Sequence, residues 1–186
     1  MPNDVPLVPD QLRTARLIVR RWQESDAAAL EAVLAVNFAH LGPWIPRRVA
    51  EPASTEKLAE RLREFSTAFD AAREWRYGLF TVEDARVLGE VSLFPRDASG
   101  RVAFHAADEI EIGYWVRVDE TGHGYATEAA WAVIAITSEL PHVSRLTIRC
   151  DERNAASTAI PRRLGFRLTS TVVERDTRLQ VWRYQL

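Results

Sequence analysis

Apolar residues follow a helical period in the first part of the chain and an extended period in the middle. Within residues 56–72 they recur at intervals of three and four residues, which predicts one apolar face of a helix. The residues of that face are Leu58, Leu62, Phe65 and Phe69. From Arg76 the period becomes two, which is typical of strands whose side chains alternate between two faces.

The remaining elements follow from the same periods and from glycine and proline stops. Further helices are predicted over residues 27–38, from the glycine run near 124 to about 140, and over 154–164. Strands are predicted over residues 17–19, 77–82, 87–93, 109–118, 145–150, 167–175 and 179–186, with the second and third joined at Glu83-Asp84 and a turn at 97–100. Three prolines in residues 1–13 predict an irregular lead-in, and residues 44–52 predict a loop. Together these elements predict one α/β domain with a mixed sheet.

The run Gly122-His123-Gly124-Tyr125-Ala126-Thr127 carries the strongest chemical signal. It follows a predicted strand and opens a predicted helix. Glycines allow a tight turn and a close backbone approach, and the first helical turn offers free N–H groups at the positive end of the dipole. This arrangement predicts a cradle for a phosphate or pyrophosphate. It is neither a dinucleotide fingerprint, because Thr127 stands where the third glycine belongs, nor a P-loop, because no Gly-Lys-Ser/Thr follows.

Composition narrows the class of protein. The chain has 186 residues, 47% of them hydrophobic, which is enough for a core, and its net charge of −2 gives no basic field for nucleic acid. Cys150 is the single cysteine, so an internal disulfide is impossible and a reducing compartment is expected. Neither a secretory signal nor an apolar run of about 20 residues is present, so we expect a cytoplasmic protein. No metal is expected, because no cluster of His, Cys and carboxylates has ligand spacing.

Three motifs in order resemble the GNAT acetyltransferase superfamily. They are Glu111-Ile112-Gly113-Tyr114-Trp115, Gly122-x-Gly124-Tyr-Ala-Thr-Glu-Ala, and Asn154-x-x-Ser157 ending in Leu164-Gly165-Phe166. Two further motifs resemble the branch that acetylates ribosomal-protein N-termini: Leu12-x-Thr14-x-Arg16-Leu17-x-x-Arg20 and Leu41-x-x-Trp44. The resemblance implies one N-acetyltransferase domain over residues 1–186, with residues 1–10 as the lead-in. It also implies a mostly antiparallel central sheet flanked by helices.

The resemblance also implies ligands and their sites. Acetyl-CoA would be the donor and a primary amine the acceptor. The pyrophosphate would bind the backbone amides of Gly122, His123, Gly124, Tyr125 and Ala126, with Thr127 in the same helical turn. The pantetheine arm would pair with the strand end at Val116 and Val118, as an added strand, and Asn154 would hold its far side.

Two departures from the family pattern affect the expected chemistry. Asp119 stands where the family often has Gln or Arg, and a carboxylate near a diphosphate is unfavourable unless it points away. Pro161 stands where many members have a tyrosine that serves as general acid, so Ser157 is the predicted substitute. For the base that takes the amine proton, Glu111 is the leading candidate and Glu109 the second. Direct attack of the amine on the thioester is expected.

The acceptor is the least determined part of the prediction. Trp44 and Arg47, with Arg48, are expected to line the acceptor site, because long loops on α/β scaffolds often carry specificity. A protein N-terminal amine is the first expectation and a small-molecule amine the alternative. A member that binds acyl-CoA without catalysis is a further alternative, whereas a nucleotide-binding oxidoreductase fits the glycine pattern poorly. The chain is expected to be a monomer or homodimer that binds neither nucleic acid nor membrane.

Overall fold

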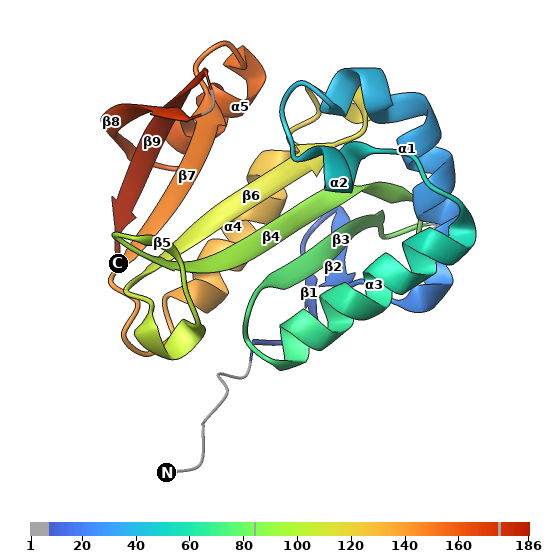
Figure 1. Cartoon of the computed structure of the whole chain (residues 1–186), viewed down its shortest axis with the longest axis horizontal. Coiled ribbons are helices and arrows are strands. Elements are labelled where there is room, and N and C mark those ends of the chain that lie inside the picture. The colour runs from blue at the N-terminus through green and yellow to red at the C-terminus, as the bar shows by residue number, and fades with distance from the viewer. Residues whose placement is uncertain (1–7, 84, 175) are drawn as a thin grey trace.

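The predicted strands assemble into one mixed sheet in the computed structural model, which describes residues 8–83, 85–174 and 176–186. Within these residues the strand order is β1-β2-β3-β4-β6-β7-β9-β8, with β5 beside β4 (Figure 1). Neighbouring strands are antiparallel except β6 and β7, which are parallel. Asp84 of the predicted turn, Arg175 at a predicted strand end and residues 1–7 of the lead-in lie outside the described residues.

The strands are β1 (Gln11–Arg13), β2 (Leu17–Arg21), β3 (Trp75–Thr81), β4 (Val87–Asp97), β5 (Gly100–Arg101), β6 (Glu109–Val116), β7 (Arg145–Asp151), β8 (Arg167–Glu174) and β9 (Thr177–Gln185). The α-helices are α1 (Ala27–Leu41), α2 (Arg47–Ala50), α3 (Thr55–Asp70), α4 (Tyr125–Thr137) and α5 (Ala155–Arg163). Short 3-10 helices are η1 (Glu24–Asp26), η2 (Phe104–Ala106) and η3 (Val118–Glu120).

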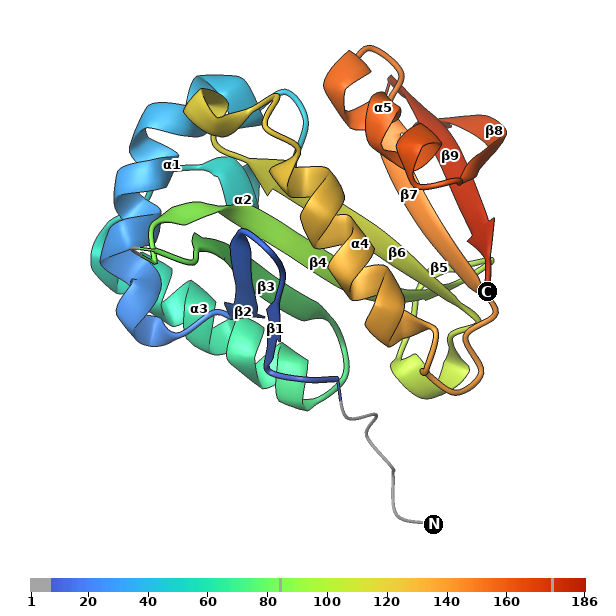
Figure 2. The same cartoon turned by 180° about the vertical axis from the view of Figure 1, so that it is seen from behind.

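Helices cover both faces of the sheet (Figures 1 and 2). The predicted apolar face of α3 is buried, and most of it packs with α1 against Trp22, Phe80 and Trp115 on one face. On the other face, α4 and α5 pack on the central strands through Ala129, Val133 and Ile160 among others. Two apolar cores therefore lie on either side of β3, β4 and β6, and both helix layers are fixed by burial of apolar surface.

Three element predictions were wrong in detail. The lead-in contains a short strand, β1, because Gln11, Leu12 and Arg13 pair with β2. The predicted loop contains one helical turn, α2, which starts after Pro46, where the fixed φ of proline favours a helix start. The strand predicted to reach Val118 ends at Val116, because the Val118 amide donates to Asn37 Oδ1 (2.7 Å) and so leaves the sheet.

Strands β4 and β6 approach each other very closely at Gly89. A Cβ atom added there would lie 2.0 Å from the carbonyl oxygen of Trp115, so only glycine fits. This contact fixes the end of β6 against β4.

Strands β6 and β7 pair over a short distance and then diverge. Their register comprises three pairs: Glu109↔Arg145, Ile110↔Leu146 and Glu111↔Thr147. Beyond Glu111, β6 continues along β4 to Val116, while β7 continues along β9 to Asp151. The facing edges of the two strands therefore carry backbone groups that no neighbouring strand pairs, and this opening positions the candidate site.

Candidate functional site

A first cavity of about 280 Å³ lies where β6 and β7 diverge. It is lined by the end of β6, the glycine loop, the first turn of α4, one side of α5 and the end of α1. The lining includes Val116, Gly124 and Asn154. The cavity thus joins an unpaired strand edge to a helix N-terminus.

The glycine loop has the conformation that an anion cradle requires. Gly122 and Gly124 have φ of 82° and 84°, in the left-handed region, and α4 begins at Tyr125 directly after Gly124. Nothing lies within 4 Å of a Cβ atom placed on Gly122, so the backbone angle rather than crowding favours glycine there. Because the first amides of a helix have no partner within it, this end of α4 offers donors to a negatively charged ligand.

The opposite wall of the cavity is the start of α5. The Asn154 side chain caps the helix, its Oδ1 accepting from the Ser157 amide at 3.0 Å. This bond satisfies the side-chain oxygen of Asn154. The side-chain NH₂ group of Asn154 has no hydrogen bond among the described residues. The Ser157 hydroxyl lies 3.4 Å from that of Tyr114, whose pKa is raised by burial.

A second cavity of about 530 Å³ lies beside the first and contains the leading candidate base. Arg96 Nη1 donates to Glu111 Oε2 at 2.7 Å, and Arg101 lies 3.8 Å from Glu111 Oε1. The Arg101 guanidinium also stacks over the Phe94 ring, 3.6 Å from its centre. Glu111 is thus a largely buried carboxylate held in place by one strong ion pair.

The floor of this cavity is a buried charge network. Glu90 accepts from Trp22 Nε1 (2.9 Å), Arg76 Nη1 (2.7 Å) and the Ser92 hydroxyl (2.8 Å). Arg76 is also bound to Glu74 at 2.7 Å. Three donors already engage Glu90, so that carboxylate has a structural role, whereas Glu111 keeps acceptor capacity at Oε1.

Six residues line both cavities and mark where they meet. They are Trp44, Ile45, Tyr114, Trp115, Asn154 and Ser157. The indole N–H of Trp115 is buried and has no partner among the described residues. Polar groups from β6 and α5 thus lie together at the junction of the two cavities. A chemical group transferred between ligands in the two cavities would react at this junction.

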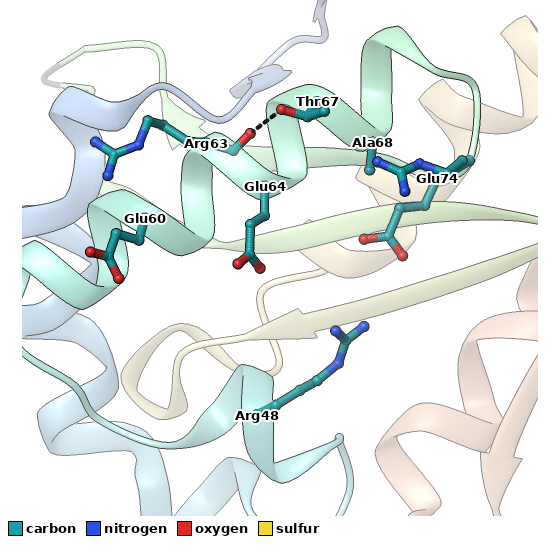
Figure 3. Close-up of a pocket in the computed structure, with 8 residues that line it drawn as sticks. Arg48, Glu60, Arg63, Glu64, Thr67, Ala68 and Glu74 are labelled. Carbon is teal, nitrogen blue, oxygen red and sulfur yellow. Dashed lines mark hydrogen bonds between the residues drawn. The ribbon is translucent and has the colours of Figure 1, made fainter.

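A groove along α3 opens next to the second cavity. Figure 3 shows Glu60, Glu64 and Glu74 on one side of it, with Arg48 pointing toward them from α2. Arg48 also lines the second cavity, and it has no ion pair or hydrogen bond among the described residues. Arg48 thus lines both the groove and the second cavity.

Neither a cluster of metal-ligating side chains nor a membrane-spanning helix is found in the described part of the chain. No group of three or more His, Cys, Asp or Glu side chains could hold a metal ion there. No helix within residues 8–83, 85–174 and 176–186 has the length and apolar character to cross a bilayer.

Comparison with known proteins identifies the family. The model of the acetyltransferase (GNAT) domain matches residues 16–167. The chain belongs to the GNAT acetyltransferase family. It is 29% identical over 164 residues to the [ribosomal protein uS5]-alanine N-acetyltransferase of Escherichia coli (strain K12), covering 88% of this chain and 80% of that protein.

Solved structures share the GNAT fold at low sequence identity. RimL, the ribosomal L7/L12 alpha-N-protein acetyltransferase in complex with coenzyme A, superposes with a TM-score of 0.78 at 18% identity, covering 93% of this chain and 96% of its own. The microcin C7 self-immunity acetyltransferase MccE, in complex with acetyl-CoA and AMP, gives 0.81 at 17% identity, covering 98% and 100%. The predicted mixed, mostly antiparallel GNAT fold is confirmed.

Within this GNAT fold, most predicted donor-site residues lie together. Val116, Gly122, Gly124, Tyr125, Ala126, Thr127, Asn154 and Ser157 all line the first cavity. Val118 and His123 do not. Val118 is in η3 with its amide bound to Asn37, and the His123 side chain is 60% exposed.

The residues predicted for the acceptor site, and the second candidate base, also lie only partly at the cavities. Trp44 lines both cavities, whereas Arg47 pairs with Glu51 at the surface and Arg48 takes the lining position. Glu109 lines neither cavity, because its carboxylate is bound by Arg145 (3.4 Å) and Arg183 (3.2 Å).

Asp119 points away from the first cavity. Both of its oxygens accept from Arg117, at 2.6 and 2.9 Å, and this pairing lowers the pKa of Asp119. Its charge is therefore neutralised locally.

Sequence reasoning missed the roles of Tyr114 and Arg163. In the sequence Tyr114 is only one residue of a motif, yet in the structure its hydroxyl reaches across the strand opening to α5. Arg163, at the end of α5, lines the first cavity and adds a cation to it. Pro161 is the sequence signal for the role of Tyr114. A proline inside a helix leaves the carbonyl four residues earlier without an amide donor, so a group from elsewhere can take that position.

Proposed function

We propose that this protein is an acetyl-CoA-dependent N-acetyltransferase whose acceptor is a protein N-terminal amine. The observation that carries the proposal is the meeting of two cavities at the divergence of β6 and β7. One cavity has an anion cradle and an unpaired strand edge, and the other has a carboxylate. Membership of the GNAT family gives the reaction class.

The first cavity fits the donor. The amides of Gly124, Tyr125 and Ala126 would hold the pyrophosphate at the N-terminus of α4. The pantetheine arm is itself amide-bearing, so it would pair with the free edge of β6 near Val116 in place of a strand. The NH₂ group of Asn154 would bind the arm from the other side. RimL and MccE carry coenzyme A or acetyl-CoA in their structures, which supports this assignment.

The second cavity fits an amine that must lose a proton before it attacks. Glu111 is the proposed base, directly or through a water molecule. Its Oε2 is engaged by Arg96, which leaves Oε1 as the oxygen that faces an incoming ammonium group. Attack of the neutral amine on the thioester carbon would form the C–N bond, break the C–S bond and release the coenzyme A thiolate. The second proton of the attacking nitrogen would pass to that thiolate or to water. No covalent enzyme intermediate is involved.

The departing thiolate needs a hydrogen bond more than a proton. A free thiol has a pKa of about 8.5, so near neutral pH a thiolate is a moderately stable leaving group. The Ser157 hydroxyl, at the junction of the cavities, is the proposed donor to the sulfur. In the absence of the donor this hydroxyl donates to Tyr114, and it would turn to the sulfur during the reaction. Tyr114 would not supply the proton itself, because its own hydrogen is donated to the Ser157 carbonyl and burial raises its pKa.

The acceptor assignment rests on the exit from the second cavity. A polypeptide attached to the reacting amine needs a path outward, and the groove along α3, which shares Arg48 with the second cavity, would provide one. Trp44, which is 39% exposed, would cover the amine from the α1–α2 loop. Similarity to a uS5-alanine N-acetyltransferase supports the same class of acceptor.

The test is release of free thiol from acetyl-CoA in the presence of N-terminal peptides or small amines, beside a control without acceptor. Release that depends on peptides supports the proposal, whereas release only with small amines transfers the reaction to that substrate class. Coenzyme A binding without release, with uS5-type peptides included, would favour a member that binds acyl-CoA without catalysis.

A further inference from the structure

The turn between β1 and β2 is fastened to the first turns of α4. The Glu128 carboxylate accepts from the Thr14 hydroxyl, from the Arg16 amide (3.0 Å) and from Arg16 Nε (2.7 Å). Arg16 Nη2 lies 2.6 Å from the same carboxylate. Thr14 and Arg16 belong to the opening motif of the chain, for which the proposed mechanism has no other use.

The same guanidinium also holds the glycine loop. Arg16 Nη1 donates to the carbonyl oxygen of His123 at 2.9 Å. In a trans peptide the C=O of one residue and the N–H of the next point in opposite directions, and the described chain has no cis peptide bond. The hydrogen bond from Arg16 holds the His123 carbonyl on the side away from the first cavity. The Gly124 N–H therefore points toward that cavity. Gly124 lines that cavity and His123 does not, as this orientation requires.

Arg16 also cancels a charge that would oppose the donor. Glu128 lies in the first turn of α4, beside the proposed pyrophosphate site. Burial alone would raise the pKa of Glu128, but hydrogen bonds from Thr14 and Arg16 outweigh it and lower the pKa. The carboxylate therefore remains ionised, and without Arg16 it would repel the pyrophosphate.

We propose that Arg16 is a positioning residue for the donor: it orients the Gly124 amide toward the pyrophosphate and neutralises Glu128 beside it. Thr14 completes the clamp from the other side of the carboxylate. This inference rests on the proposed function, because it requires the first cavity to bind coenzyme A.

Arg20 provides a matched control within the same strand pair. It forms a bidentate ion pair with Asp26, at 2.8 and 2.7 Å, and stacks over Phe80, away from both cavities. Arg16→Gln and Arg20→Gln thus each remove an arginine that grips a carboxylate with two hydrogen bonds. Only the first should change the donor site.

The experiment measures the dissociation constant of coenzyme A by calorimetry, with thermal unfolding in parallel. Arg16→Gln should raise it about tenfold or more, since hydrogen bonds to a charged group are lost. Arg16→Lys should recover part of the affinity, because it keeps the charge but not the fork. Adding Glu128→Gln to Arg16→Gln should also recover part, by removing the unpaired carboxylate.

Recovery in the Arg16→Gln, Glu128→Gln double variant is the decisive result. A purely structural clamp would lose further affinity when its second partner is removed. An Arg16→Gln protein that is folded and binds coenzyme A within about twofold of wild type would overturn the inference, and so would an equal loss with Arg20→Gln. Failure of the wild-type protein to bind coenzyme A at all would instead refute the proposed function, and this inference with it.

Discussion

The hydroxyl group of Tyr114 donates a hydrogen bond of 3.0 Å to the backbone carbonyl of Ser157. In a regular α-helix that carbonyl accepts from the amide four residues later, which here belongs to Pro161 and has no hydrogen. Tyr114 of β6 thus fills a hydrogen-bond position that proline leaves open in α5. The two sides of the strand opening are joined by this bond at the junction of the cavities.

Tyr114→Phe should therefore lower the free energy of unfolding by about 1–2 kcal/mol, because the Ser157 carbonyl loses its partner. Pro161→Ala supplies an amide to the same carbonyl, so Tyr114→Phe should cost less in the Pro161→Ala background. Urea unfolding of the four proteins measures the coupling. Strictly additive losses would show that the tyrosine and the proline are independent.

Ser157→Ala should lower kcat about tenfold or more while changing the dissociation constant of acetyl-CoA little, since the proposed bond forms to sulfur as it leaves. The matched control is Thr158→Val on the same helix. The Thr158 hydroxyl is buried and donates to the Ala155 carbonyl, outside both cavities. Steady-state thiol release would contradict the role of Ser157 if both variants turned over alike.

Glu111→Gln should lower kcat about 100-fold or more, with donor binding retained, because the amide cannot accept the amine proton. Arg96→Gln separates this role from that of the ion pair, since it removes the partner at 2.7 Å but keeps the carboxylate. Arg96→Gln should retain clearly more activity than Glu111→Gln. Equal losses, or wild-type turnover in Glu111→Gln across the pH range, would remove Glu111 as the base.

Gly124→Asp should abolish coenzyme A binding, because it places a side chain at a left-handed backbone position and a negative charge beside the pyrophosphate. Gly100→Asp is the matched control. Gly100 also has a positive φ, of 137°, and a Cβ atom there meets nothing within 4 Å. Calorimetry should show normal affinity in the control, and retained affinity in Gly124→Asp would refute the pyrophosphate assignment.

The Glu128 clamp predicts a pH dependence of stability. Because the pKa of Glu128 is lowered in the folded protein from its ordinary value of 4.5, its contribution is complete above that pH. The contribution is lost as the pH falls through the lowered pKa. Wild type should thus melt at a higher temperature than Glu128→Gln at pH 7, and the gap should narrow as the pH falls below 4.5. A gap that is constant with pH would mean that the charge of Glu128 contributes nothing.

Local signals predicted much of this protein. The apolar period predicted α3, the two-residue period predicted β3 and β4, and the glycine pattern predicted the turn before α4. The helix predicted over residues 154–164 is present as α5, with Asn154 as its N-terminal cap. These features depend on residues within one or two turns of each other, which sequence displays directly.

Features that depend on distant partners were not predictable. Arg16 and Glu128 are 112 positions apart, and their contact depends on how β2 packs beside α4. The partner of Glu111 follows from the register of β4 against β6, which places Arg96 diagonally across from it. For the same reason the sequence makes both Glu111 and Glu109 candidate bases, with Glu111 first, although only Glu111 lines either of the two cavities.

Strands β6 and β7 are joined by three residue pairs, and beyond these pairs the sheet has a gap that the bound donor would fill. A bound small molecule would then supply contacts that a neighbouring strand supplies elsewhere in the sheet. Since a ligand that binds only the folded state stabilises it by mass action, the lifetime of this protein in the cell should rise and fall with the supply of acetyl-CoA. Scarcity of the acyl donor would thus remove the catalyst as well as the substrate.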